Sequence, residues 1–224
     1  MPRIRAATIE EHHEMVWADL TEAVRRLLLE RDYDSITMGH IATEAGLARN
    51  TLYNYAADKK TLVLELARRA SRPLAEQVSA IAARSRQPAA ERLREIIEVI
   101  LAGSTNHAMR LMFLPSAGPL VADLPDGHDN PFTALVVEVE KVVRDGIAGG
   151  EFRDVDDVQL TVELLSGAMR AGCDRISRDP ASLAATVRAA QRITLASIGI
   201  DTGIDAAKGV TTHDNGVVTT AKDG

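Results

Sequence analysis

The stretch from Ile36 to Leu62, ITMGHIATEAGLARNTLYNYAADKKTL, decides the fold of this chain. It reads as two short helices joined by a tight turn and followed directly by the start of a third helix. Thr37 can cap the first helix, whose inner face would hold Ile41 and Ala45. Gly46 then ends that helix, because glycine adopts the left-handed conformation that reverses the chain with little strain. The pattern predicts a helix-turn-helix, which places its second helix in a groove of DNA.

The second helix of this motif carries its polar residues on the side away from the first. Leu47 and Leu52 would anchor it, which leaves donors, acceptors and aromatic rings free for phosphates and base edges. Asp58 would cap the next helix, whose first turn carries Lys59 and Lys60 beside backbone N–H groups that attract phosphate. The open side of the second helix comprises Arg49, Asn50, Thr51, Tyr53, Asn54 and Tyr55.

At these residues the chain closely resembles the tetracycline-repressor (TetR) family of bacterial regulators. The matching elements are T-M-x-x-I-A-x-E-A-G-L at Thr37 to Leu47, T-L-Y-x-Y at Thr51 to Tyr55 and D-K-x-x-L at Asp58 to Leu62, in the family's order and spacing. The resemblance implies an all-helical dimer with an amino-terminal DNA-binding head and a larger body that binds a small molecule. On the family pattern, the DNA-facing positions of this chain are Thr37, Arg49, Asn50, Thr51, Tyr53, Tyr55 and Lys59.

Two residues depart from the family pattern within the head. The family usually has Ser or Thr where this chain has Ala48, so the recognition helix lacks a side-chain cap worth about 1 kcal/mol in typical hosts. The family usually has Phe at the position of Ala56, where the ring packs beneath the recognition helix. We therefore expect either a looser head or one repacked by Trp17 or Tyr33.

The composition of the 224 residues fits an all-α protein. Helix formers dominate, aromatic residues make up 3%, and no long alternation of β-branched residues suggests a sheet. The net charge is −6, and residues 1–62 hold eight Lys and Arg against ten Asp and Glu, a net charge of −2. Most of these acids lie in the first helix and its exit, whereas Arg49, Lys59 and Lys60 lie at the proposed surface. We therefore expect specific rather than indiscriminate DNA binding.

The rest of the chain predicts a helical body. Helices are expected at about 8–31, 58–84, 88–106, 108–114, 132–147, 156–177 and 180–198. Pro73 should kink the second of these or break it in two, and four prolines between Pro115 and Pro131 exclude a regular helix there.

This pattern divides the chain into three parts. We assign residues 1–57 to DNA binding, 58–200 to ligand binding and dimerisation, and 201–224 to a disordered tail rich in Gly, Thr and Asp. The last two helices would pair with those of a second copy as a four-helix interface; the alternative is that they only complete the core of one chain.

Soft and aromatic side chains in the body suit an irregular apolar cavity for an effector. Few charges interrupt this set, which predicts a mostly apolar ligand oriented by one or two polar groups. Any one of these residues is more often plain core than a ligand contact. The candidate ligand contacts are His107, Met109, Met112, Phe113, Phe132, Leu135, Val139, Leu165 and Met169.

No motif supports an enzymatic function, because the chain lacks G-x-S-x-G, a Walker phosphate loop, G-x-G-x-x-G and H-E-x-x-H. The single cysteine, Cys173, excludes an intramolecular disulfide, and Asp126, His128 and Asp129 lack a matched partner for a metal site. We expect neither a metal nor a cofactor. The start of the chain is not a secretory signal and no run of about 18 apolar residues could span a membrane, which predicts a cytoplasmic location.

Taken together, the sequence predicts a homodimeric transcriptional repressor that binds a palindromic double-stranded DNA operator and is released by a small-molecule effector. The alternative is a helical small-molecule- or partner-binding protein whose head no longer binds DNA.

Overall fold

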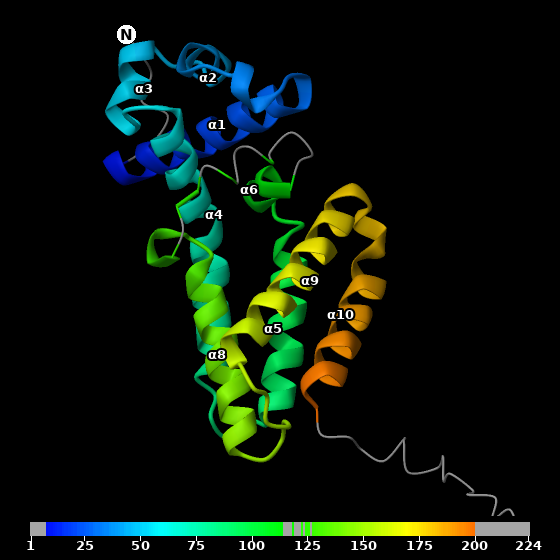
Figure 1. Cartoon of the computed structure of the whole chain (residues 1–224). Helices are drawn as coiled ribbons and strands as arrows, with labels where there is room; N and C mark the ends of the chain where they lie inside the picture. Colours follow the sequence, from blue (N-terminus) through cyan, green and yellow to red (C-terminus); the bar gives the residue numbers. More distant parts are fainter. Residues whose placement is uncertain (1–7, 114–117, 119–121, 123, 126, 200–224) are drawn as a thin grey trace, which may run out of the picture.

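The computed structural model describes residues 8–113, 118, 122, 124–125 and 127–199. Apart from an isolated β-bridge between Phe152 and Gly199, the regular structure of these residues is helical, which confirms the all-α prediction. Figure 1 shows a small head joined to a longer helical body by α4. The tail predicted for 201–224 and part of the proline-rich segment lie outside the described residues.

The head consists of α1 (Ile9–Glu30), the short turn η1 (Tyr33–Ser35), α2 (Met38–Glu44) and α3 (Arg49–Tyr55). A capping box starts α1, in which the Thr8 hydroxyl accepts the Glu11 N–H at 3.1 Å. The apolar stripe of α1 is buried at each of its positions. These are Val16, Leu20, Val24, Leu27 and Leu28.

The core of the head contains aromatic side chains from outside the recognition helix. Trp17 and Tyr33 are 5% and 3% exposed and belong to the same apolar cluster as Ala56. Ala56 is itself buried, although it contributes only a methyl group. Of the two expectations for the head, repacking by Trp17 and Tyr33 is the one the structure supports.

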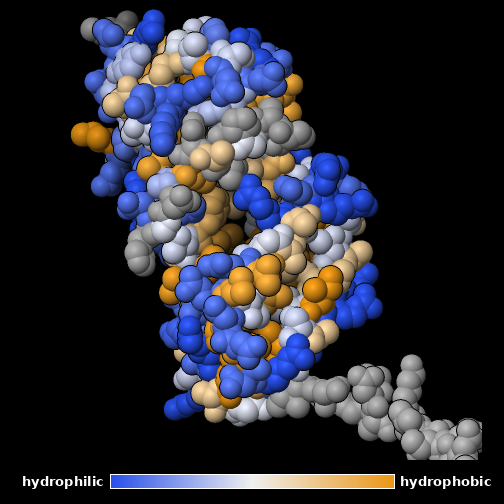
Figure 2. Space-filling model, in the orientation of Figure 1, coloured by the Kyte–Doolittle hydropathy of each residue, from blue (hydrophilic) through white to orange (hydrophobic). Residues whose placement is uncertain are grey.

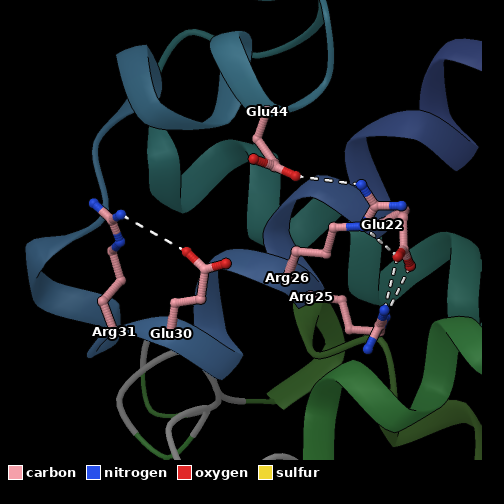
Figure 3. A network of polar contacts seen from close by, with 6 residues as sticks. All are labelled: Glu22, Arg25, Arg26, Glu30, Arg31 and Glu44. Carbon is pink, nitrogen blue, oxygen red and sulfur yellow. Dashed lines mark hydrogen bonds and ion pairs between the residues drawn. The ribbon is translucent and has the colours of Figure 1, made fainter.

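Ion pairs join α1 to α2 on the surface of the head (Figure 3). Glu22 accepts hydrogen bonds from Arg25 and Arg26, and Arg26 also reaches Glu44 of α2 at 3.4 Å. Glu30 and Arg31 form a further pair at 3.9 Å. Surface pairs of this kind each stabilise a protein by well under about 1 kcal/mol. Their main effect here is electrostatic, because arginines neutralise the charge of three acidic residues of the head. None of the six residues belongs to α3.

The helix α4 (Lys59–Ala82) runs from the head into the body. Asp58 caps it, since its carboxylate accepts the Thr61 N–H at 2.7 Å, and this hydrogen bond lowers the pKa of Asp58. The helix continues through Pro73, so the predicted break into two helices does not occur. Buried side chains on both sides, including Leu66 and Leu74, hold the helix together across the missing N–H.

The body is built from helices that surround a second apolar cluster. They are α5 (Ala89–Gly103), α6 (His107–Arg110), η2 (Leu111–Phe113), η4 (Gly127–Asp129), α8 (Thr133–Ala148), α9 (Val158–Arg178), η5 (Pro180–Ser182) and α10 (Leu183–Ile198). The two carboxylate oxygens of Glu151 accept the N–H groups of Ala89 and Ala90 at 2.9 and 3.1 Å, so the loop after α8 caps α5. Within the described residues, no helix has the length and apolar character to span a bilayer.

The two apolar clusters meet at η2. Leu111 and Met112 lie in the body by sequence, yet they are buried in the same cluster as the core of the head, together with Leu124. Phe113 and Phe132 pack against both clusters. The head and the body therefore share part of their cores.

Candidate DNA interface and ligand cavity

The turn between α2 and α3 has the predicted geometry. Gly46 adopts a positive φ of 67°, and the next residue, Leu47, donates its N–H to Ala42 at 2.8 Å. Leu52 is fully buried and anchors α3. Ala48, the residue directly before α3, makes no side-chain cap, because its methyl group cannot accept a hydrogen bond. The opposite side of α3 is consequently presented outward on a helix fixed at its turn.

Four of the predicted DNA-facing residues lie on or beside this outward side. Arg49 and Asn50 are exposed, Tyr53 is 42% exposed, and Thr51 is half-buried. The guanidinium carbon of Arg49 lies 6.0 Å from the centroid of the Tyr53 ring, at the limit of a cation–π contact. These side chains form the most accessible polar surface of α3.

Thr37 has a structural task at the start of α2. Its hydroxyl oxygen accepts the His40 N–H at 3.2 Å, and its own N–H is donated to Nδ1 of His40 at 3.3 Å. This reciprocal pair is a capping box with histidine in the usual place of Glu. Thr37 remains exposed, and its hydroxyl proton is free to donate outward.

Tyr55 and Lys59 are engaged inside the head. Tyr55 stacks on His13 with ring centroids 5.1 Å apart and meets Trp17 edge to face at 5.5 Å. Lys59 donates from Nζ to the backbone oxygen of Tyr33 at 2.9 Å and lies 4.0 Å from the centroid of its ring. An ammonium has three donors, so Lys59 keeps others for a phosphate. The role of all seven residues toward DNA stays a prediction.

The body contains a partly open cavity of about 360 Å³. Figure 2 shows an apolar hollow at the middle of the molecule, between α4 and α9. Of the nine residues predicted to contact a ligand, eight line the cavity. They are Met109, Met112, Phe113, Phe132, Leu135, Val139, Leu165 and Met169. The ninth, His107, belongs to α6, but its side chain lies outside the described residues.

The polar side chains of the cavity wall were missed by sequence reasoning. Neutral polar groups come from Asn130, Ser166, Cys173 and Thr194. Arg170 is the charged residue among the described residues that line the cavity. Burial raises the pKa of the Cys173 thiol to about 11, so the sulfur is neutral at physiological pH. No local signal separates the four residues in helices from ordinary helix positions, because each follows the same helical repeat as its neighbours, and Asn130 lies in the bend before α8.

No group of His, Cys, Asp or Glu side chains in the described part of the chain could hold a metal ion. The sequence trio near Asp129 is only partly described, since Asp126 and the side chain of His128 lie outside that part.

Comparison with known proteins agrees with this arrangement. Residues 20–66, which span the second half of α1 through the first turns of α4, match the sequence model of bacterial regulatory proteins of the tetR family. No curated protein matches the chain at a significant level.

Solved structures of similar fold come from several bacteria. The fatty acid degradation regulator FadR of Bacillus halodurans has a TM-score of 0.66 at 15% identity, covering 80% of this chain and 94% of its own. FadR of Bacillus subtilis, solved in complex with stearoyl-CoA, has a TM-score of 0.67 at 16% identity, covering 83% and 99%. A protein of Shewanella sp. PV-4, described as a tetR family transcription regulator, has a TM-score of 0.65 at 18% identity, covering 83% and 98%. Residues 20–66 of this chain therefore match the tetR family of bacterial regulatory proteins, and its whole fold is similar to that of these solved regulators.

Proposed function

We propose that this regulator binds a palindromic DNA operator as a homodimer and represses transcription until a small, mostly apolar molecule enters the body. The observation that carries the proposal is the combination, in one chain, of an outward polar face on α3 and a partly open apolar cavity whose wall is shared with the core of the head. We assign DNA binding to residues 1–57 and ligand binding with dimerisation to residues 58–200.

The proposed DNA contacts fall into two groups. Arg49, Asn50 and Tyr53 are the most exposed members and are suited to base edges and phosphates in the major groove. Thr37, Thr51, Tyr55 and Lys59 would act at the margin, through their remaining donors toward the phosphate backbone. The start of α4 would add the N–H groups of a helix N-terminus beside Lys60.

The outer faces of α9 and α10 support dimerisation. Leu160 and Leu164 of α9 are 50% and 69% exposed, and Ile193 of α10 is 57% exposed. A small exposed residue at Ala171 would allow a second pair of helices to approach closely. Figure 2 shows apolar atoms over this region. Two copies related by a twofold axis would bury these side chains in a four-helix interface.

The proposed regulation follows from linkage between the cavity and the separation of the two heads. A ligand that binds better to a dimer with another head spacing lowers operator affinity by that difference in binding energy and by no more. The Bacillus subtilis FadR complex shows that a neighbour of this fold binds a molecule with a long apolar chain. The apolar wall of the cavity supports a mostly apolar ligand here.

Selection from random double-stranded DNA with the full-length protein tests the proposal. We expect enrichment of a palindrome whose half-site centres lie about 34–36 Å apart or a further helical turn away. Affinity for it should fall steeply between about 50 and 200 mM salt. Arg49→Ala should weaken the complex, whereas Arg72→Ala, which removes the same charge from an exposed position in the body, should not. Binding without an enriched sequence would contradict the proposal and favour a head that has lost operator recognition.

Sedimentation of the free protein tests the dimer. Leu164→Glu should shift the protein toward monomer, because a carboxylate would be buried at the interface. Val137→Glu is the matched control, since Val137 is 51% exposed on α8 outside the proposed interface. A monomeric wild type, or equal behaviour of both variants, would contradict the assignment of α9 and α10.

A further inference from the structure

The wall of the body cavity indicates which class of molecule it takes. We infer that the effector is an amphipathic anion, an apolar chain or ring system with one acidic group, and that the acidic group is held by Arg170. This rests on the proposed ligand-binding function and names the chemistry of its site.

The interior of the cavity excludes charge. Its deep wall is formed by side chains such as Leu93, Ile96 and Leu165, which are 1%, 0% and 9% exposed. A charged group placed among them would lose its hydration without compensation, which costs several kcal/mol at least. The part of a ligand that enters must therefore be apolar, and any charge has to remain at the opening.

The opening lies beside α9. Among the lining residues, Gly167 and Arg170 are exposed, whereas the others are buried or half-buried. A ligand with its apolar portion inside would consequently have its outer end next to the Arg170 guanidinium. This position is the polar end that an amphipathic molecule requires.

The guanidinium of Arg170 has no partner among the described residues. The arginines further along the same helix differ: Arg175 pairs with Asp179 at 3.2 Å, and Arg178 donates to the backbone oxygen of Asp174 at 3.2 Å. Toward the described residues, the five N–H donors of Arg170 are thus unpaired, and they form a fork that matches a carboxylate or phosphate.

The positive charge of Arg170 also reaches the cavity wall. The pKa of the Cys173 thiol is raised chiefly by burial, and the charge of Arg170 acts against that rise. An anionic ligand group at the opening would be stabilised by the same field.

The neutral polar groups of the wall are less available than Arg170. Ser166 donates its hydroxyl to Val162 at 2.8 Å, and the side-chain oxygen of Asn130 accepts the Phe132 N–H at 2.9 Å. The hydroxyl proton of Ser166 and the amide oxygen of Asn130 are therefore already used within their own helix or turn. The strongest polar attraction offered to a ligand is therefore that of a cation for an acid.

Calorimetric titration of the full-length protein with decanoic acid, decan-1-ol and decylamine tests this inference. These probes share one apolar chain and differ in the charge of the end group. We expect the acid to bind roughly 10- to 100-fold more tightly than the alcohol, the range of a charge-assisted hydrogen bond, and the amine to bind weakest. Equal affinities for acid and alcohol would overturn the inference and leave an uncharged effector for the proposed function.

Variants of the protein test where the carboxylate of decanoic acid binds. Arg170→Ala should reduce decanoic acid affinity roughly 10-fold or more without changing decanol affinity, and Arg170→Lys should lie between, since lysine lacks the fork. Arg188→Ala removes an exposed charge from α10 and should change neither. Val139→Phe, which fills the cavity, should weaken both probes. Acid binding that survives Val139→Phe or Arg170→Ala would overturn the inference, whereas operator binding in the DNA selection is independent of all these results.

Discussion

Replacing Lys59 with methionine tests whether this lysine stabilises the head in the absence of DNA. The Lys59 ammonium donates to the backbone oxygen of Tyr33 at 2.9 Å and lies 4.0 Å from the centroid of the Tyr33 ring. Methionine keeps most of the apolar stem, so the substitution removes the charge and the donors while retaining much of the packing. A residue that acts only on phosphate would leave the free protein unchanged.

The expected loss follows from the two contacts. A hydrogen bond from a charged group contributes about 1.5–3 kcal/mol, and a cation–π contact near the surface about 0.5–1 kcal/mol. Lys59 is half-buried, so water replaces part of both contacts in the variant. We therefore expect the free energy of unfolding to fall by about 1–2 kcal/mol, which lowers Tm by about 2–8 °C in a chain of this size.

Urea unfolding of the full-length protein without DNA measures this loss. Lys60→Met is the matched control, because Lys60 is exposed on the same turn, and its substitution should change the free energy of unfolding by less than about 0.5 kcal/mol. If Lys59→Met and Lys60→Met unfold alike, the contact with Tyr33 does not stabilise the head. Weaker DNA binding by Lys59→Met has to be compared with this measurement, because a less stable head would also bind DNA less well.

Four further substitutions or conditions give defined outcomes. Gly146→Ala would place a methyl group onto the ring of Phe152 and should cost about 1–3 kcal/mol in urea unfolding, whereas Gly167→Ala meets no atom within 4 Å and should be near neutral. Cys173 should react with iodoacetamide at pH 8 at least about 100-fold more slowly in the folded than in the unfolded protein, because burial raises its pKa to about 11 and shields it. The same shift predicts that stability falls as pH rises from about 9 to 11, since the unfolded thiol loses its proton first; a flat profile across this window in comparison with Cys173→Ala would contradict it. Arg92→Met should destabilise the protein by about 1–3 kcal/mol in urea, because it removes the buried donor to Ala82 and the pair with Asp145; an unchanged midpoint would show that neither contact contributes.

Much of the fold could be predicted because its signals are local. The stripe of α1, the caps at Thr37 and Asp58 and the turn at Gly46 each depend on residues a few positions apart. Pro73 was harder, since whether a helix survives a proline depends on the packing around it. That packing comes from partners elsewhere in the chain.

The site was only partly predictable for the same reason. Lys59 and Tyr33 are separated by 26 positions, so no spacing rule joins them. Helical periodicity identifies the inward faces of the body, and soft and aromatic residues pointed to much of the cavity wall. Helical periodicity does not predict where helices that face each other leave a cavity between them. Arg170 illustrates this limit, because in sequence it resembles Arg175 and only the position of the opening distinguishes the two.

The double membership of Met112 has a consequence for folding. This side chain is part of the core of the head and also of the wall of the cavity, while Leu111 and Leu124 join it in the head. A fragment that ends within α4 would lose these residues and expose the apolar surface they cover, so the DNA-binding module is not a self-sufficient folding unit. An occupant of the cavity would press on the same methionine, and its binding energy would therefore add to the cooperativity with which the whole protein melts.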